Sequence, residues 1–165
     1  RTCDKSNSVG IIGTKATIQS NTYQDLILQL SPDIRLNAIP CPAFVPLIEE
    51  GIIENEIMDL SIKYYMDSFI EDHKIDTLVL GCTHYPLIRD NINRIYPFLN
   101  IIDPSREIAA HIQRQLTERN LLAKNSDFEN TFYASDLSEN FVNMINRIFE
   151  INRFKVEFKN LDFDV

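Results

Sequence analysis

Residues 77–86 read TLVLGCTHYP, and they contain the clearest strand-to-helix transition in the chain. Apolar or β-branched residues fill positions 77–80 and end at Gly81, which is typical of a buried strand. Pro86 suits the first turn of a following helix, where its missing N–H costs no hydrogen bond. The stretch therefore predicts a buried strand, a short polar loop and a helix.

The same alternation of strand-like and helix-like segments recurs along the whole chain. Further strands are expected at residues 9–14, 36–39, 100–102, 131–134 and 154–158, the last an edge strand. Helical spacing of apolar residues predicts helices within 23–30, 53–69, 86–95, 104–122 and 137–148. Short strands that alternate with helices predict an α/β fold with a mainly parallel sheet flanked by helices.

Local patterns add finer predictions. The long helix is expected to carry a second apolar stripe beside the first, which widens the face that packs on the sheet. The members of this second stripe are Ile53, Ile57, Leu60 and Tyr64. Asp103 before Pro104 is expected to cap a helix, and Asp136 with Glu139 has the spacing of a capping box. Residues 124–130 are polar and are expected to form a linker.

Composition limits the classes of function. The 165 residues include 16 basic and 24 acidic side chains, so the net charge is 16 − 24 = −8. Such a charge argues against nucleic acid and anionic membranes as partners, because both reward positive patches. No apolar run approaches the roughly 20 residues of a membrane helix. The chain starts at Arg1 without Met or a signal region, so we expect a soluble, cytoplasmic piece of a longer protein.

Cys82 is the leading candidate for chemistry. In a parallel sheet the carboxyl ends of the strands form the reactive edge, and Cys82 directly follows a predicted strand. A helix N-terminus and a neighbouring imidazole favour the thiolate, so His84 is expected to assist Cys82 and Thr83 to bind substrate. The alternative is that Cys82 is a small buried residue that closes the strand.

The other candidate residues are more ambiguous. Thr14 and Thr17 follow the predicted strand at 9–14, and substrate binding and helix capping are equally good explanations for both. Glu49 either ends a solvated helix or faces the site. Cys41, between two prolines, is expected to be structural or merely tolerated, with a second catalytic thiol as the alternative. Cys3, His73 and His111 are expected to have no role at the site.

The sequence also bears on cofactors. It contains no CxxC pair, and no further ligand stands at metal spacing beside Cys82. Lys15 follows Gly13-Thr14 but lacks the glycine-rich loop of a nucleotide-binding motif. We therefore expect no metal and no nucleotide cofactor. What remains is cofactor-free thiol chemistry on a small anionic substrate, held by helix-terminal N–H groups and hydroxyls.

Three motifs in order resemble the glutamate racemases of the aspartate/glutamate racemase family. They are GIIGTKATIQS at 10–20, CPAFVPLIE at 41–49 and LGCTHYPLI at 80–88. The segments IDPS at 102–105 and, more weakly, YASD at 133–136 also fit, so the resemblance covers nearly the whole chain. It implies the fold of that family and interconversion of L- and D-glutamate without pyridoxal phosphate or metal.

The resemblance also implies roles for single residues. Enzymes of the family use two cysteines on opposite faces of the α-carbon, one as base and the other as acid. Cys82 matches the second of the two, which takes the proton from L-glutamate. By the same match His84 assists it, Thr14, Thr17 and Thr83 bind substrate, and Glu49 approaches the substrate amine. D-Glutamate from this reaction supplies peptidoglycan synthesis, and the full-length enzyme is a possible homodimer.

The family's amino-terminal half, with its Ala-Cys-Asn-Thr motif, does not occur in this sequence. Residues 1–105 are therefore expected to form the α/β domain that carries Cys82. Residues 106–165 are expected to return to the missing amino-terminal domain, and this chain alone is expected to be inactive. Two alternatives stay open: racemisation of aspartate or another acidic amino acid, and a catalytically dead domain that binds a ligand or a partner.

Overall fold

The computed structural model describes residues 8–123, 130–149 and 154–160. A four-stranded sheet forms its centre, with strands β1 (Ser8–Gly13), β2 (Arg35–Pro40), β3 (Thr77–Gly81) and β4 (Asn100–Ile102). The strand order is β2-β1-β3-β4, and every pairing is parallel. This confirms the predicted α/β fold with a parallel sheet.

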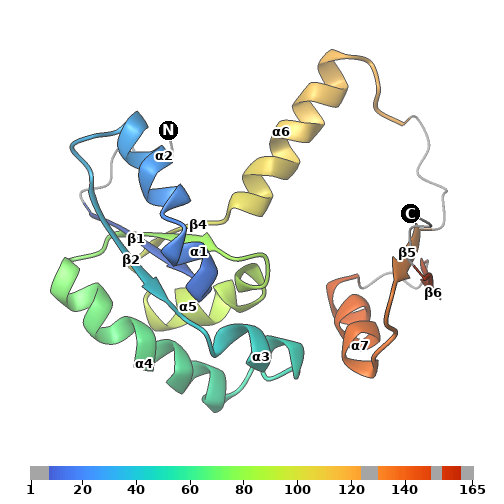
Figure 1. Ribbon diagram of the computed structural model, residues 1–165, viewed down its shortest axis with the longest axis horizontal. Coiled ribbons are helices and arrows are strands. Elements are labelled where there is room, and N and C mark those ends of the chain that lie inside the picture. Colours follow the sequence, from blue (N-terminus) through green and yellow to red (C-terminus); the bar gives the residue numbers. More distant parts are fainter. Residues whose placement is uncertain (1–7, 124–129, 150–153, 161–165) are drawn as a thin grey trace.

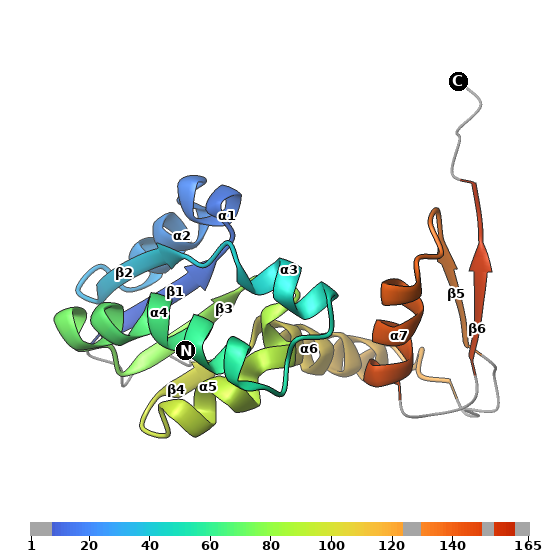
Figure 2. The same ribbon diagram turned by 90° about the horizontal axis from the view of Figure 1, so that it is seen from below.

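Helices cover both faces of this sheet (Figures 1 and 2). On one face lie α1 (Lys15–Gln19) and α2 (Thr22–Leu30). On the other lie α3 (Phe44–Glu49), α4 (Glu56–His73), the 3₁₀ turn η1 (Tyr85–Ile88) and α5 (Arg89–Ile95). Pro86 therefore stands in a 3₁₀ turn, and the α-helix expected from Pro86 onward begins three residues later.

The larger core lies under α3, α4 and α5. Its fully buried side chains include Phe44, Met58, Ile62, Tyr85 and Ile92. Burial of such side chains contributes about 1.5–3 kcal/mol each, so this layer stabilises the sheet domain strongly. The core fixes the positions of α3 and η1, whose neighbouring loops carry the candidate site residues.

The prediction for the second stripe of α4 is wrong. Ile57, Leu60 and Tyr64 are 56%, 65% and 82% exposed. The buried side of the helix is formed instead by Met58, Ile62, Met66, Phe69 and Ile70. The sheet meets α4 along that one side, and the second stripe lies on a part of the helix surface that no other element of the described residues covers. Ile53 is buried, but it precedes the helix.

Helix α6 (Pro104–Glu118) leaves the sheet domain after β4 (Figure 1). Asp103 caps it as predicted, since its Oδ1 accepts hydrogen bonds from the Ser105 backbone N–H at 3.0 Å and the Ser105 hydroxyl at 2.6 Å. None of its residues is buried. The helix stops at Glu118 rather than running toward Leu122, because Asn120 adopts a left-handed conformation with φ 55°.

Beyond α6, a second and smaller sheet pairs β5 (Asn130–Ala134) with β6 (Phe154–Phe158) in parallel beside α7 (Glu139–Ile148). The predicted capping box of Asp136 and Glu139 is wrong. Ser138 is the N-cap instead, and its hydroxyl accepts a hydrogen bond from the Phe141 N–H at 3.2 Å. Glu139 is already inside the helix, so Asp136 lies too far upstream to cap it. Most of the predicted linker, residues 124–129, lies outside the described residues.

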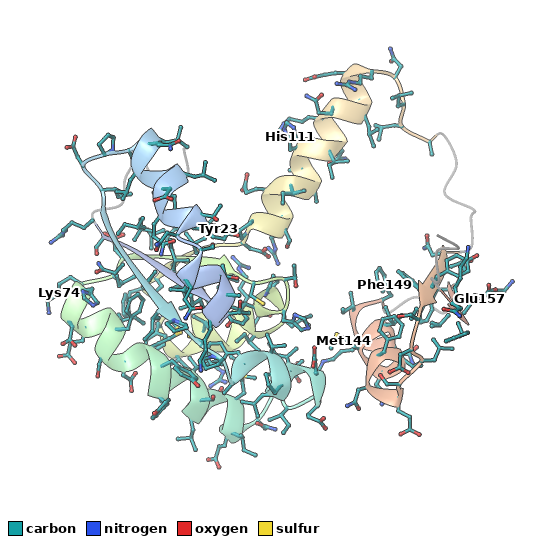
Figure 3. All side chains as sticks on the ribbon, in the orientation of Figure 1. Tyr23, Lys74, His111, Met144, Phe149 and Glu157 are labelled. Atoms are coloured by element: carbon teal, nitrogen blue, oxygen red, sulfur yellow. The ribbon has the colours of Figure 1, made fainter. Side chains whose placement is uncertain are left out.

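Helix α7 contacts the sheet domain at α3 and the loop after it. Met144 packs against the larger core (Figure 3). The Asn140 amide donates to Glu50 Oε1 at 3.4 Å, and Arg147 pairs with Glu54 at 3.2 Å. No helix in the described ranges is long and apolar enough to span a membrane.

Candidate functional site

The carboxyl ends of three strands lie level with one another at one edge of the large sheet. In the sheet register Gly13 of β1 is opposite both Pro40 of β2 and Gly81 of β3. The loops that follow these strands begin with Thr14, Cys41 and Cys82 respectively. The register therefore brings together candidate residues that are far apart in the sequence.

There is no room for a side chain at Gly81, where β3 pairs with β1 at this edge. A Cβ placed on Gly81 would lie 2.8 Å from the backbone oxygen of Ile12, a distance that real Cβ atoms essentially never show. The strands can approach this closely only because residue 81 has no side chain. Cys82 is the next residue, so this close approach fixes where its backbone starts.

Cys82 is half-buried and lines a cavity of about 420 Å³. The cavity lies between α1, the β3–η1 loop and the start of α6. Its lining is formed by Thr17, Tyr23, Leu80, Gly81, Cys82, Thr83, Pro86, Asp103, Pro104, Ser105 and Ile108. Three of the predicted site residues, Thr17, Cys82 and Thr83, thus share one cavity, which is large enough for a small metabolite.

Thr14 is the N-cap of α1, which supports the capping explanation for this residue. Its hydroxyl oxygen accepts a hydrogen bond from the Thr17 N–H at 3.2 Å. The two threonine hydroxyl oxygens lie 2.9 Å apart and share a second hydrogen bond. Thr17 lines the Cys82 cavity and Thr14 does not. Thr14 therefore orients the residue that reaches the cavity.

His84 is held from both ring nitrogens. Its Nε2 lies 3.2 Å from Oε1 of Glu49, and its Nδ1 lies 3.4 Å from the Thr83 hydroxyl oxygen. The His84 side chain is 28% exposed and the Glu49 side chain 53%. Glu49 is thus a helix-end carboxylate whose partner in the structure is His84, and neither of the two side chains lines the Cys82 cavity.

A second cavity, of about 480 Å³, adjoins His84 on the side of α7. Glu49, Glu50 and His84 contribute to its lining from the sheet domain, and Asn140 and Met144 from α7. His84 and Glu49 therefore stand at the boundary between the sheet domain and the unit that contains α7.

Cys41 is structural, as predicted. It is fully buried, and burial raises the pKa of its thiol to about 12. Its backbone N–H donates to the Gly13 carbonyl at 2.8 Å, and its carbonyl accepts from the Tyr85 hydroxyl at 3.0 Å. The loop after β2 is thereby tied both to β1 and to the turn that follows Cys82.

Tyr85 is the site-supporting residue that the sequence analysis missed. Its fully buried ring packs edge-on against Phe44 at 5.3 Å, and burial raises the pKa of its hydroxyl above the usual range. The proton therefore stays on the hydroxyl, which can keep donating to Cys41. The local sequence shows an aromatic residue before a proline, but nothing in it points to a partner 44 residues earlier.

Known proteins of similar sequence and structure identify the family. No family model matches the chain. A glutamate racemase from Sulfurihydrogenibium sp. is 47% identical over 109 residues, which are 66% of this chain and 42% of that protein. The crystal structure of a glutamate racemase from Francisella tularensis, in complex with D-glutamate, superposes with a TM-score of 0.86 at 36% identity. The chain belongs to the glutamate racemase family.

The alignments cover most of this chain but only part of each related protein. The Francisella alignment covers 97% of this chain and 60% of that structure. A second racemase, from Persephonella marina, is 46% identical over 70% of this chain and 44% of its own length. The chain thus spans about half the length of the curated glutamate racemases it matches.

Other residues considered in the sequence lie away from the site of this racemase-family chain. His73 is in the last turn of α4, where its carbonyl accepts a hydrogen bond from the Ser8 hydroxyl at 2.8 Å. His111 is exposed on α6 (Figure 3). Cys3 lies outside the described residues. Among the residues that are described, no three His, Cys, Asp or Glu side chains are grouped to hold a metal ion.

Proposed function

We propose that this chain supplies one of the two acid–base thiols of a glutamate racemase, and that this thiol belongs to Cys82. The observation that carries the proposal is the placement of Cys82 in the strand-end cavity, which Thr17 and Thr83 also line. His84 follows two residues later and contacts the Thr83 hydroxyl. The chain's membership of the glutamate racemase family supports glutamate as the substrate.

The reaction needs one group on each face of the α-carbon. The Cys82 thiolate removes the α-proton of L-glutamate, and an acid on the opposite face returns a proton, which inverts the centre. His84 assists proton transfer at Cys82. Hydroxyls of Thr17 and Thr83 bind the substrate's polar groups. Thr14 holds Thr17 in place through their shared hydrogen bonds, and Glu49 contributes through its contact with His84. Local donors of this kind can hold an anion although the chain carries a charge of −8.

Cys41 is a poor candidate for the second acid. It is fully buried, and the raised pKa of about 12 keeps it a neutral thiol, so it is not placed to exchange protons with a substrate. We therefore propose that the second acid–base group comes from a domain complementary to residues 1–105. In this proposal residues 106–165 belong with that domain, which agrees with the absence of buried residues along α6.

A chimera tests the proposal. The homologous portion of the Sulfurihydrogenibium racemase is replaced by this chain, and conversion of L- to D-glutamate is followed by polarimetry. We expect turnover by the chimera, loss of at least a hundredfold with Cys82→Ser, and no requirement for metal or pyridoxal phosphate. A folded chimera whose turnover is unaffected by Cys82→Ser would contradict the assignment. The same assay with L-aspartate distinguishes a glutamate racemase from an aspartate racemase.

The cellular role follows from the same proposal. D-Glutamate made by the complete enzyme would supply peptidoglycan synthesis in the cytoplasm. The expected homodimer of the full-length protein, the absence of nucleic acid as a partner and the independence from cofactors stay predictions.

A further inference from the structure

The contacts of the His84 ring indicate a role for Glu49, a residue that does not itself exchange a proton with the substrate. We infer that Glu49 is a positioning residue that selects the tautomer of His84. The observation is the 3.2 Å distance between Glu49 Oε1 and His84 Nε2, together with the 3.4 Å distance between Thr83 Oγ1 and His84 Nδ1. The importance of this tautomer for catalysis rests on the proposed function. The tautomer itself is argued only from the two contacts of the ring.

Hydrogen-bond chemistry gives the direction of the effect. A neutral imidazole carries one N–H and one bare nitrogen, and an ionised carboxylate can only accept. Glu49 therefore requires the hydrogen of neutral His84 to be on Nε2. Nδ1 is then the bare nitrogen, and it accepts from the Thr83 hydroxyl. Both ring nitrogens have defined roles, so the proton-accepting atom of His84 lies on the side of Thr83 and not on the side of Glu49.

The fold supplies the carboxylate from a rigid base. Glu49 is the last residue of α3, and α3 is anchored by the buried side chains of Phe44 and Ile48. The next residue, Glu50, faces α7 and accepts from Asn140 at 3.4 Å. Adjacent glutamates thus have different partners. Glu50 is therefore a natural control for any general effect of removing a negative charge from the end of α3.

The same geometry separates positioning from stability. Both partners are partly exposed, and ion pairs of that kind contribute little to the folding free energy. Removal of the Glu49 carboxylate is therefore expected to change the state of the His84 ring without unfolding the chain.

The test is ¹⁵N NMR of the chain labelled on histidine, in a background with His73→Gln and His111→Gln so that only His84 reports. The ring ¹⁵N shifts of neutral histidine are averages over the two tautomers. With Glu49→Ala the ratio of Nε2–H to Nδ1–H is expected to fall about two- to fivefold, the range for a partly exposed pair of this kind. Glu49→Gln should give a smaller fall, because its amide oxygen still accepts.

Controls decide what the shift means. Glu50→Ala should leave the His84 ratio unchanged, and both alanine variants should unfold at the temperature of the parent chain. An unchanged ratio in Glu49→Ala, or an equal change in Glu50→Ala, would overturn the inference. In the active chimera, Glu49→Ala should lower kcat more than it changes KM for glutamate. If the chimera shows no racemase activity while the ratio still changes, the proposed function fails and the positioning role stands.

Discussion

The close approach of β1 and β3 gives a sharp prediction for Gly81→Ala. The new methyl group would lie 2.8 Å from the Ile12 backbone oxygen and 3.4 Å from Ile11 Cγ2. The first of these neighbours is backbone within a paired strand, so it cannot turn aside as a side chain would. Either β3 moves away from β1 at this level, or the strain stays in place.

The expected cost is that of an overpacked core, about 1–3 kcal/mol in the free energy of unfolding. For a domain of this size, each kcal/mol lowers the midpoint of thermal unfolding by about 4–8 °C. Urea unfolding followed by circular dichroism measures the cost. Because Cys82 directly follows Gly81, alkylation of Cys82 by iodoacetamide should also change its rate in the folded variant.

Gly10→Ala is the matched control. Its Cβ would lie 2.9 Å from Phe69 Cε1 and 3.0 Å from Ile75 Cγ2, which are side-chain atoms able to shift. It should therefore cost less than Gly81→Ala and leave the alkylation rate of Cys82 unchanged. If Gly81→Ala is as stable as the parent chain, or if Gly10→Ala costs more, the argument from backbone crowding is refuted.

Three further predictions concern hydrogen bonds and thiols. Tyr85→Phe removes the donor to the buried Cys41 carbonyl, so urea unfolding should show a loss of about 1–3 kcal/mol. Hydrogen bonds from Arg94 and, to a smaller degree, Asn91 lower the pKa of Asp59. The ionised Asp59 carboxylate therefore stabilises the fold fully above the unfolded pKa of about 3.9, and this stabilisation is lost as pH falls through the lower folded pKa. The stability difference between parent and Asp59→Asn should therefore shrink below about pH 4 in acid titrations of unfolding. Peptide mapping after brief alkylation at pH 8 should find Cys82 modified and Cys41 intact, because burial raises the Cys41 pKa to about 12; equal modification would contradict its structural role.

The strands and the site loop could be predicted because their signals are local. Residues 77–80 are consecutive apolar or β-branched residues, and a proline follows at a helix-starting position. Strand β3 and its loop can therefore be predicted from this stretch alone, without knowledge of what packs against it. The cap of Asp103 on α6 is local in the same way, since the side chain bonds a backbone group two residues away. Such features depend on neighbours in sequence, and the structure confirms them.

Predictions that needed knowledge of packing were less successful. The second stripe of α4 has the helical spacing of a buried face, yet Leu60 and Tyr64 are exposed because the sheet already meets the other side of the helix. Likewise the spacing of Asp136 and Glu139 fits a capping box, but the helix starts after Ser138. Spacing defines which residues share a face, and only the neighbouring elements decide which face is covered.

By itself the sequence determined the parallel α/β fold, the placement of Cys82 at a strand end and the likeness to glutamate racemases. The tertiary structure alone decided the contacts between the loops: Thr17 in the same cavity as Cys82, Tyr85 hydrogen-bonded to Cys41, and Glu49 beside the ring of His84. The physical reason is distance along the chain. Hydrophobic periodicity is a property of residues close together in the sequence. These contacts instead join loops that come together only when the parallel strands align their carboxyl ends.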